Sequence, residues 1–279
     1  EYTYYVVEID PPANFTPDGV NDLTVTNTYH SPMTTADSYK AWSPSGLLDS
    51  LKFNVTFQLW RYIGSDSSTA SLVEPEMNTV LDGTVDAPCD APCGYEIEPW
   101  QVRWIGIPET DINGNEYYYV VKETSALNPG FTKTGELTDT ITNSYNNENP
   151  DVLQDLVSNK NWEPSGLLDS MKFPVTFELF RYIGDDPETA VAVPLTLVLD
   201  GTEDTPCADD AFNCAYEGPA WVANWVNIET TDAAGNEYHY IVKETSALDD
   251  GFSKAESGMN VTNSYNNENP DVLQDLVSN

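Results

Sequence analysis

Glutamates occur at three positions that sequence periodicity assigns to the protein interior. In the stretch EYYYVVKETSAL, Tyr119, Val121 and Glu123 fall on one face at the two-residue period of a β-strand. The pattern returns as EYHYIVKETSAL with Glu244, and as EYTYYVVE at the start of the chain with Glu8. Aromatic and β-branched residues dominate all three stretches, so each is predicted to be a strand with an inward carboxylate.

A lysine and an asparagine share this inward parity. In YKAW, Lys40 has the parity of Trp42, and in TITNSY, Asn143 replaces an apolar residue in a core row. Two complete sets and a partial one result: Lys40, Glu123 and Asn143; Lys160, Glu244 and Asn263; and Glu8 with Asn27. Burying any of these groups alone costs several kcal/mol, so the members of each set are expected to meet.

These sets belong to a repeat. PSGLLDSLKFNVTFQLWRYIG at 44–64 returns as PSGLLDSMKFPVTFELFRYIG at 164–184, a shift of 120 residues. The chain is therefore interpreted as a window on a longer tandem array. Its predicted parts are residues 1–30, the C-terminal part of a preceding repeat; 31–146 and 147–266, two complete domains; and 267–279, a linker and the first strand of a following repeat.

Each repeat has an all-β pattern. In KFNVTFQLW, the residues Phe53, Val55, Phe57 and Leu59 alternate with polar ones, which predicts a half-buried strand. WQVRWIGI and WVANWVNI supply a further strand, DINGNEY and DAAGNEY supply turns, and no helical stripe of useful length is present. Several short strands separated by turn signals predict a β-sandwich in each repeat.

The four cysteines form two local pairs at matching places in the two repeats. They are Cys89 and Cys93 in CDAPC, and Cys207 and Cys214 in CADDAFNC. With no nearby histidine and only two sulfurs at each place, a zinc site is poorly supported. Local disulfides are the favoured interpretation, although four cysteines allow other pairings, and they indicate an oxidising, extracellular compartment.

The charge balance excludes some partners. The 279 residues hold 11 Lys and Arg against 46 Asp and Glu, a net charge of −35, so nucleic acid and anionic membrane are not expected as partners. No run of eighteen apolar residues exists to span a membrane. No cofactor or metal is predicted, and DINGNE is interpreted as a turn in preference to a calcium loop.

Together these features resemble the collagen-adhesin B-type (Cna-B) domain of bacterial surface adhesins and pilins. The matching elements are Lys-x-Trp in the first strand, the course of WQVRWIGIPETDINGNEYYYVVKE into a Tyr-x-Val-x-Glu strand, and a final Thr-Asn-x-Tyr. The resemblance covers both complete repeats and the 1–30 segment, and it implies tandem Ig-like β-sandwiches. Glu229 stands where the first repeat has Pro108, and the cysteine loops depart from the usual pattern.

The resemblance further implies an internal amide bond in each domain. Lys40 would attack the side-chain carbonyl of Asn143 while Glu123 polarises it, and the second set would react in the same way. Desolvation favours a neutral, nucleophilic lysine and a protonated glutamate. The bond would form once per domain, so an enzyme acting on an external substrate is not expected. A hydrogen-bonded cluster without covalent closure is the alternative.

The predicted function is an extracellular or cell-surface structural filament or stalk, stabilised by Lys–Asn isopeptide bonds and disulfides. Neighbouring repeats or subunits of the same fibre are the expected partners, and a surface or matrix ligand is a further one. Two alternatives remain open at this point. One is a ligand-binding surface adhesin, and the other is a fibre of several chains that exchange strands.

Overall fold

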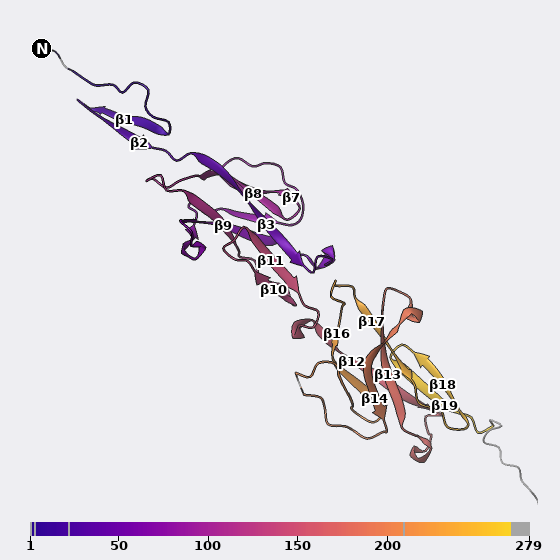
Figure 1. The fold of residues 1–279 in the computed structure, drawn as a ribbon. Helices are drawn as coiled ribbons and strands as arrows, with labels where there is room; N and C mark the ends of the chain where they lie inside the picture. The colour runs from indigo at the N-terminus through magenta and orange to yellow at the C-terminus, as the bar shows by residue number, and fades with distance from the viewer. Residues whose placement is uncertain (1, 3, 22, 209, 269–279) are drawn as a thin grey trace, which may run out of the picture. The chain divides into compact units, whose positions relative to one another are not determined.

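The computed structural model describes residues 2, 4–21, 23–208 and 210–268. The chain divides into two compact units, Glu1–Tyr145 and Asn146–Asn279 (Figure 1). Regular structure in the described part consists of strands and single-turn 3-10 segments. The predicted all-β fold of tandem Ig-like sandwiches is therefore confirmed. Of the predicted final segment, residues 269–279 lie outside the described residues.

The sandwich of the first unit contains two sheets. One has the order β10-β11-β3-β8-β7, and in the other β4 pairs with β9 on one side and with β5 and β6 on the other. The first sheet is made of β3 (Met33–Ser43), β7 (Cys93–Glu98), β8 (Gln101–Pro108), β10 (Phe131–Thr134) and β11 (Thr140–Tyr145). The second is made of β4 (Val55–Ile63), β5 (Ser71–Leu72), β6 (Asn78–Leu81) and β9 (Tyr117–Glu123).

The second unit repeats this arrangement. Its sheets have the orders β15-β16-β12-β19-β18 and β14-β13-β17. The first sheet is made of β12 (Leu153–Glu163), β15 (Cys214–Glu217), β16 (Val222–Glu229), β18 (Phe252–Ser257) and β19 (Asn260–Tyr265). The second is made of β13 (Val175–Ile183), β14 (Val191–Leu199) and β17 (Tyr238–Glu244).

The core lies between the two sheets of each unit. Val55, Phe57 and Leu59 of β4 are fully buried, as the alternation in KFNVTFQLW predicted, and they pack with Val102 and Trp104 of β8. The same alternation buries the corresponding side chains of β13. Side chains at every second position of these strands face the opposite sheet, so the apolar residues of both sheets meet in one layer.

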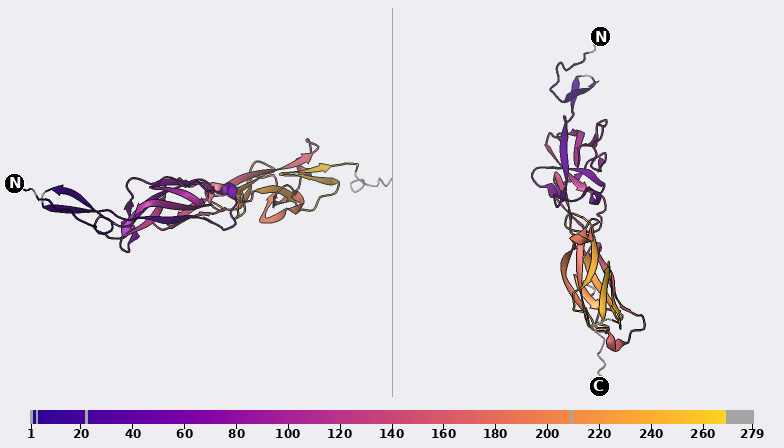
Figure 2. Two further views of the ribbon diagram at one scale, coloured as in Figure 1. Left: turned by 90° about the horizontal axis from the view of Figure 1, so that it is seen from above. Right: turned by 90° about the vertical axis from the view of Figure 1, so that its right-hand side faces the viewer.

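The first and last strands of each sandwich are neighbours. Strand β3 pairs in parallel with β11, and β12 pairs in parallel with β19. In Figure 2, β12 and β19 belong to the sandwich drawn in the later colours of the bar. Parallel neighbours need a long connection, and here the connection is almost the whole unit. The first and last strands of each domain thus lie side by side in one sheet and run in the same direction.

The prediction of a strand at the start of the chain is wrong. Residues 4–8 are described but belong to no strand, whereas the matching β9 and β17 are regular. In the complete units these strands pair with β4 and β13. Within the described residues, no strand pairs with residues 4–8, so the ladder of backbone hydrogen bonds that defines a strand is missing there. The hairpin of β1 (Phe15–Asn21) and β2 (Thr24–Tyr29) follows it.

Both predicted disulfides are present. Cys89 bonds to Cys93 and Cys207 bonds to Cys214, and no cysteine is free. Each bond closes a loop of the chain that leads into β7 or β15. In the part of the chain that the structure describes, no helix has the length and apolarity needed to cross a membrane.

Candidate functional site

The structure brings Lys40, Glu123 and Asn143 together inside the first sandwich. Lys40 Nζ lies 3.2 Å from Glu123 Oε2, and Asn143 Nδ2 donates to Glu123 Oε1 at 3.0 Å. The side chains of the lysine and the glutamate are 0% exposed, and Asn143 is fully buried. The glutamate is therefore a bridge between the two other groups, as the inward parity of all three predicted.

The second sandwich contains the same arrangement. Lys160 Nζ lies 3.2 Å from Glu244 Oε2, and Asn263 Nδ2 donates to Glu244 Oε1 at 3.0 Å. These side chains are buried to the same degree as their counterparts. The two sets come from different stretches of sequence, so the agreement indicates that the residue pattern itself determines the geometry.

Three strands from both sheets position the first set. Lys40 lies on β3 and Asn143 on β11, and in the parallel register Lys40 faces Ile141 while Trp42 faces Asn143. Lys40 Nζ also points to the carbonyl oxygen of Ile141 at 3.4 Å. Glu123 ends β9 in the opposite sheet. Its carboxylate therefore reaches across the interior to the first and last strands.

Aromatic rings surround the lysine. Lys40 Nζ lies 4.7 Å from the centre of the Trp42 ring. Trp42 meets Phe53, Trp100 and Phe131 edge to face, with ring centres 5.1–5.8 Å apart. The second unit has the equivalent group of rings around Lys160. This aromatic layer removes water from the amine, which disfavours its charged form.

Burial lowers the pKa of Lys40 to about 8, although the nearby carboxylate of Glu123 opposes the change. The positive charge of Lys133 lowers the pKa of Lys40 further. The pKa of Lys160 is lowered to about 8 for the same reason, with Lys254 in the place of Lys133. Each amine is thus uncharged far more often near neutral pH than an exposed lysine is, and the uncharged form is the one that can act as a nucleophile.

Each site leaves polar atoms without a hydrogen bond. In the first unit these include Asn143 Oδ1 and Trp42 Nε1, and the second unit has the same two atoms on Asn263 and Trp162. Glu123 Oε2 accepts no hydrogen bond but lies in ion-pair contact with Lys40. The amine and the amide flank one carboxylate. The arrangement can support attack of the amine on the amide carbon, with the carboxylate moving the protons.

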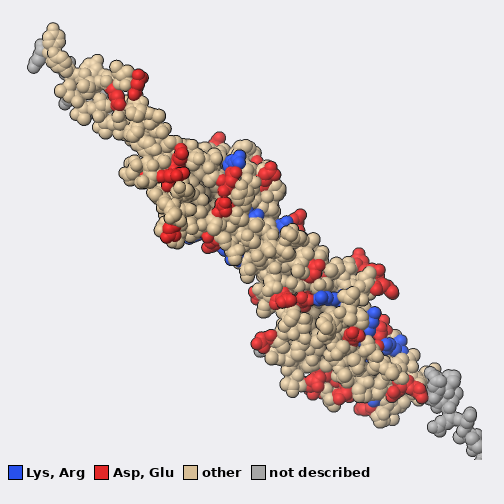
Figure 3. Space-filling view, viewed as in Figure 1, with Lys and Arg blue, Asp and Glu red and all other residues tan. Residues whose placement is uncertain are grey.

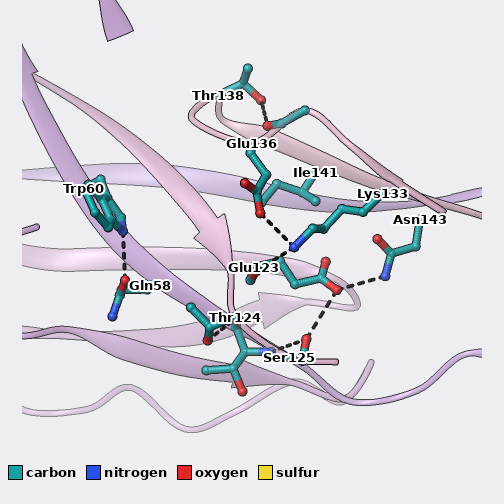
Figure 4. Close-up of polar contacts among 12 residues, drawn as sticks. Gln58, Trp60, Glu123, Thr124, Ser125, Lys133, Glu136, Thr138, Ile141 and Asn143 are labelled. Carbon is teal, nitrogen blue, oxygen red and sulfur yellow. Dashed lines mark hydrogen bonds and ion pairs between the residues drawn. The ribbon is translucent and has the colours of Figure 1, made fainter. Parts of the chain in front are cut away.

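Two further residues of the site were not predicted from sequence. Ser125 Oγ donates to Glu123 Oε1 at 3.3 Å and accepts from the backbone N–H of Thr56 at 3.3 Å. Lys133 Nζ donates to the backbone oxygen of Glu123 at 2.7 Å (Figure 4). Ser246 and Lys254 make the corresponding contacts in the second unit. Sequence repetition could have identified both residues. The serine recurs in the two copies of KETSAL, and the lysine recurs at matching places in FTK and FSK.

The partial set, Glu8 and Asn27, makes one of the contacts seen in the complete sets. Asn27 Nδ2 donates to Glu8 Oε1 at 3.2 Å, so the glutamate and the asparagine meet as they do in the complete units. This pair is exposed, however, and the sequence before Asn27 contains no lysine. The contact between these two side chains therefore forms even where the glutamate is not part of a strand.

A second buried carboxylate in each unit was also missed. Glu96 is 1% exposed and accepts the backbone N–H groups of Asp82 at 3.0 Å, of Gly83 at 3.1 Å and of Trp100. Glu217 does the same in the second unit. These carboxylates contact no lysine of the candidate site. They hold the loop that contains the disulfide, so their role is structural.

The turn interpretation of DINGNE is confirmed. The Asp111 carboxylate accepts the backbone N–H groups of Asn113 and Asn115 at 2.8 Å each, and therefore closes the turn. Asp232 makes the equivalent turn in the second unit. Across the described residues, no group of three His, Cys, Asp or Glu side chains is arranged to hold a metal ion.

The comparison with protein families identifies one domain. Residues 184–264 match the Cna protein B-type domain. This stretch lies in the second unit and contains Glu244 and Asn263, so the resemblance to Cna-B domains seen in the sequence is confirmed. No curated protein matches the chain.

Solved structures give further neighbours. Two B repeat units of the collagen binding protein Cna of Staphylococcus aureus are 16% identical over 92% of this chain, with a TM-score of 0.31. The pilus adhesin SpaC of Lactobacillus rhamnosus GG is 14% identical over 88% of this chain, with a TM-score of 0.26. The chain spans 56% of the Cna structure and 30% of the SpaC structure.

Proposed function

We propose that the chain is an extracellular structural repeat protein whose sandwiches crosslink themselves. Lys40 would be joined to Asn143 by an isopeptide bond, and Lys160 to Asn263. The observation that carries the proposal is the buried Lys–Glu–Asn set, which occurs with the same distances in both units. A lysine that is partly neutral beside a buried carboxamide supports it further.

The proposed reaction is a transamidation within the domain. The neutral Lys40 Nζ attacks Cγ of Asn143, and a new C–N bond forms while the bond from Cγ to Nδ2 breaks. Glu123 accepts a proton from the attacking nitrogen and delivers one to the departing nitrogen, which leaves as ammonia. No oxidant or cofactor enters this balance. The glutamate is regenerated, but the lysine and the asparagine are consumed, so each domain reacts once.

The position of the bond suggests a mechanical role. Lys40 lies on the first strand of its sandwich and Asn143 on the last, and these strands are adjacent in the sheet. A covalent bond between them would carry tension applied to the two ends of the domain. The hydrogen bonds of the intervening strands would then remain unloaded. This property suits a stalk or filament of tandem domains.

An extracellular location is supported by both disulfides, which persist in oxidising compartments. Carboxylates are distributed over the visible face of both units, and lysines and arginines are few (Figure 3). Such a surface keeps a protein soluble and repels other acidic surfaces. We propose that neighbouring repeats or subunits of the same fibre are its main partners.

A ligand-binding role is a second candidate. The two cysteine loops differ in length and sequence, CDAPC against CADDAFNC, while the buried site is the same in both units. Phe212, in the longer loop, is 43% exposed. Variable loops on a constant scaffold favour recognition of a surface or matrix ligand. Binding of the chain to immobilised matrix proteins or glycans would support this role, and its absence would leave the structural one.

The intact mass of the denatured and reduced chain tests the proposed crosslinks. We expect a deficit of one ammonia for each complete unit, and peptide mapping should show Lys40 joined to Asn143 and Lys160 joined to Asn263. The variants Lys40→Arg and Lys160→Arg should each restore one ammonia to the mass. An unmodified wild-type mass would contradict the proposal and reduce both sets to buried polar clusters.

A further inference from the structure

Each candidate site contains a second lysine that the proposed reaction does not consume. Lys133 lies on β10 directly opposite Asn143 in the antiparallel register, and Lys254 of β18 lies directly opposite Asn263. Each donates its ammonium to the backbone oxygen of the site glutamate. Figure 4 shows Lys133 on the side of Glu123 away from Ser125. The second lysine therefore contacts the residue that would move the protons.

This second lysine has an acidic partner of its own. Lys133 Nζ lies 2.7 Å from Glu136 Oε1, and Lys254 Nζ lies 3.0 Å from Glu256 Oε1. The partner is three residues after the lysine in the first unit and two residues after it in the second, so the ion pair is kept although its sequence position differs. Glu256 also accepts the backbone N–H of Glu244 at 3.0 Å. The ion pair is thus attached to the end of the strand that bears the glutamate.

The two lysines of a site differ in their surroundings. The side chain of Lys133 is 20% exposed and has both a carboxylate and a backbone oxygen as partners. The side chain of Lys40 is 0% exposed, and Glu123 is its one carboxylate partner. Two ammonium groups close to one another are disfavoured, so the positive charge of Lys133 favours the neutral form of the buried Lys40 amine. The charge of Lys133 accordingly contributes to the lowered pKa of Lys40.

We propose that Lys133 and Lys254 are positioning residues of the crosslinking sites. Each fixes the end of the strand that bears the glutamate and keeps a positive charge beside the reacting lysine, so that the reacting lysine is the one that becomes neutral. The inference rests on the proposed crosslinks. It adds to them a residue in each unit that sets the pH range and rate of the reaction without being consumed.

Refolding kinetics of the full chain test this role. The chain is produced in an insoluble form that has never folded, so that it is uncrosslinked when dissolved in denaturant. It is then refolded by dilution at a series of pH values and quenched at intervals for peptide mapping. In Lys133→Met, the second unit keeps its own site and serves as an internal reference within the same molecule. The ratio of the two crosslinking rates then cancels differences in dilution and temperature. Lys254→Met gives the reciprocal experiment.

We expect Lys133→Met to slow formation of the first crosslink about 2- to 5-fold below its midpoint pH, as removal of a screened like charge predicts. The midpoint should move to higher pH, because the pKa of Lys40 rises when the neighbouring charge is lost. Lys133→Arg keeps the charge and should retain the wild-type midpoint. Lys122→Met is the matched control, because Lys122 has the opposite parity on β9, with its Nζ 3.6 Å from the centre of the Trp60 ring.

Two results would overturn the positioning role, and a third would contradict the crosslinks themselves. An unchanged rate and midpoint in Lys133→Met would overturn the positioning role. An equal slowing at every pH, with no shift of the midpoint, would also overturn it, since the proposed role requires a positive charge beside Lys40 and that result describes only a loosened strand. Far-ultraviolet circular dichroism confirms that each variant refolds. Retention of both ammonias by the refolded wild type would instead contradict the crosslinks themselves, and with them this inference.

Discussion

Asn143 lies directly opposite Trp42 in the parallel pairing of the first and last strands of its sandwich. This register places the asparagine two positions beyond Lys40 on the neighbouring strand, and both side chains face the carboxylate of Glu123. Trp162 and Asn263 have the same relationship in the second unit. The pairing of the first and last strands therefore fixes which lysine and which asparagine meet.

Replacing the glutamate should block one crosslink and leave the other. Glu123→Gln keeps the size of the side chain but removes the carboxylate that would carry protons between the two nitrogens. The intact mass should then show the loss of one ammonia in place of two, and peptide mapping should assign the remaining crosslink to Lys160 and Asn263. Glu116→Gln, at an exposed position just before β9, should leave both crosslinks in place. A crosslinked first unit in Glu123→Gln would exclude the carboxylate as the proton carrier.

The reaction should be faster at higher pH. The amine of Lys40 is a nucleophile only when unprotonated, and its pKa is lowered to about 8. The rate of crosslink formation during refolding should therefore rise with pH through about 8 and level off above it. Lys160, whose pKa is also lowered to about 8, should give the same profile. A rate that is constant from pH 6 to pH 9 would show that deprotonation of the lysine does not limit the reaction.

Removing only the lysine should destabilise the first unit more than removing the whole ion pair. Lys40→Met leaves the buried carboxylate of Glu123 without its cation, which costs about 3–5 kcal/mol when one partner of a buried pair is deleted. The double variant Lys40→Met with Glu123→Met has no buried charge. Because neither variant can form the first crosslink, calorimetry of the two full chains isolates the charge effect. A double variant no more stable than the single one would contradict this account.

The carboxylate of Glu96 should hold the disulfide loop in place. Glu96→Gln puts an amide group against backbone N–H groups, so at least one buried donor loses its acceptor, at a cost of about 1–3 kcal/mol. Hydrogen exchange should increase at Gly83 and its neighbours while the crosslink mass stays unchanged. Glu98→Gln, an exposed position at the end of β7, is the control and should change neither.

The cysteines should be fully oxidised in the native protein. Alkylation of the denatured, unreduced chain should add no label, since both pairs are bonded. Alkylation after reduction should label all 4 cysteines. Labelling before reduction would show that the chain resides in a reducing compartment, against the proposed extracellular location.

Much of the site was predictable because it depends on local pattern. The two-residue period of a strand identifies Glu123 and Asn143 as inward residues, and the repeat shows that this is no accident of one segment. Ser125, which follows β9, and Lys133, which lies on β10, were missed because neither stands out in its own stretch of sequence. Their importance depends on contacts with a glutamate that the chain reaches elsewhere, and parity says nothing about contacts of that kind.

The segment at the start of the chain shows that a strand-like sequence pattern does not by itself produce a strand. Residues 4–8 have the composition of β9, yet they form no strand. Strand propensity expresses how well a side chain fits a sheet, and the sheet must be supplied by another part of the chain. Glu8 nevertheless meets Asn27, so the pairing of these two side chains survives without the surrounding strand.

The sequence by itself determined the repeat, the all-β class, the local cysteine pairs and the inward parity of the lysine, glutamate and asparagine. These properties follow from the spacing of residues along the chain, which can be read from the amino-acid sequence alone. Tertiary structure alone decided that the first and last strands are parallel neighbours, that one carboxylate bridges the other two groups, and that a second lysine stands beside them. Those relationships join residues that lie up to 103 positions apart, as Lys40 and Asn143 do, and only packing of the two sheets brings them within hydrogen-bond distance of one group.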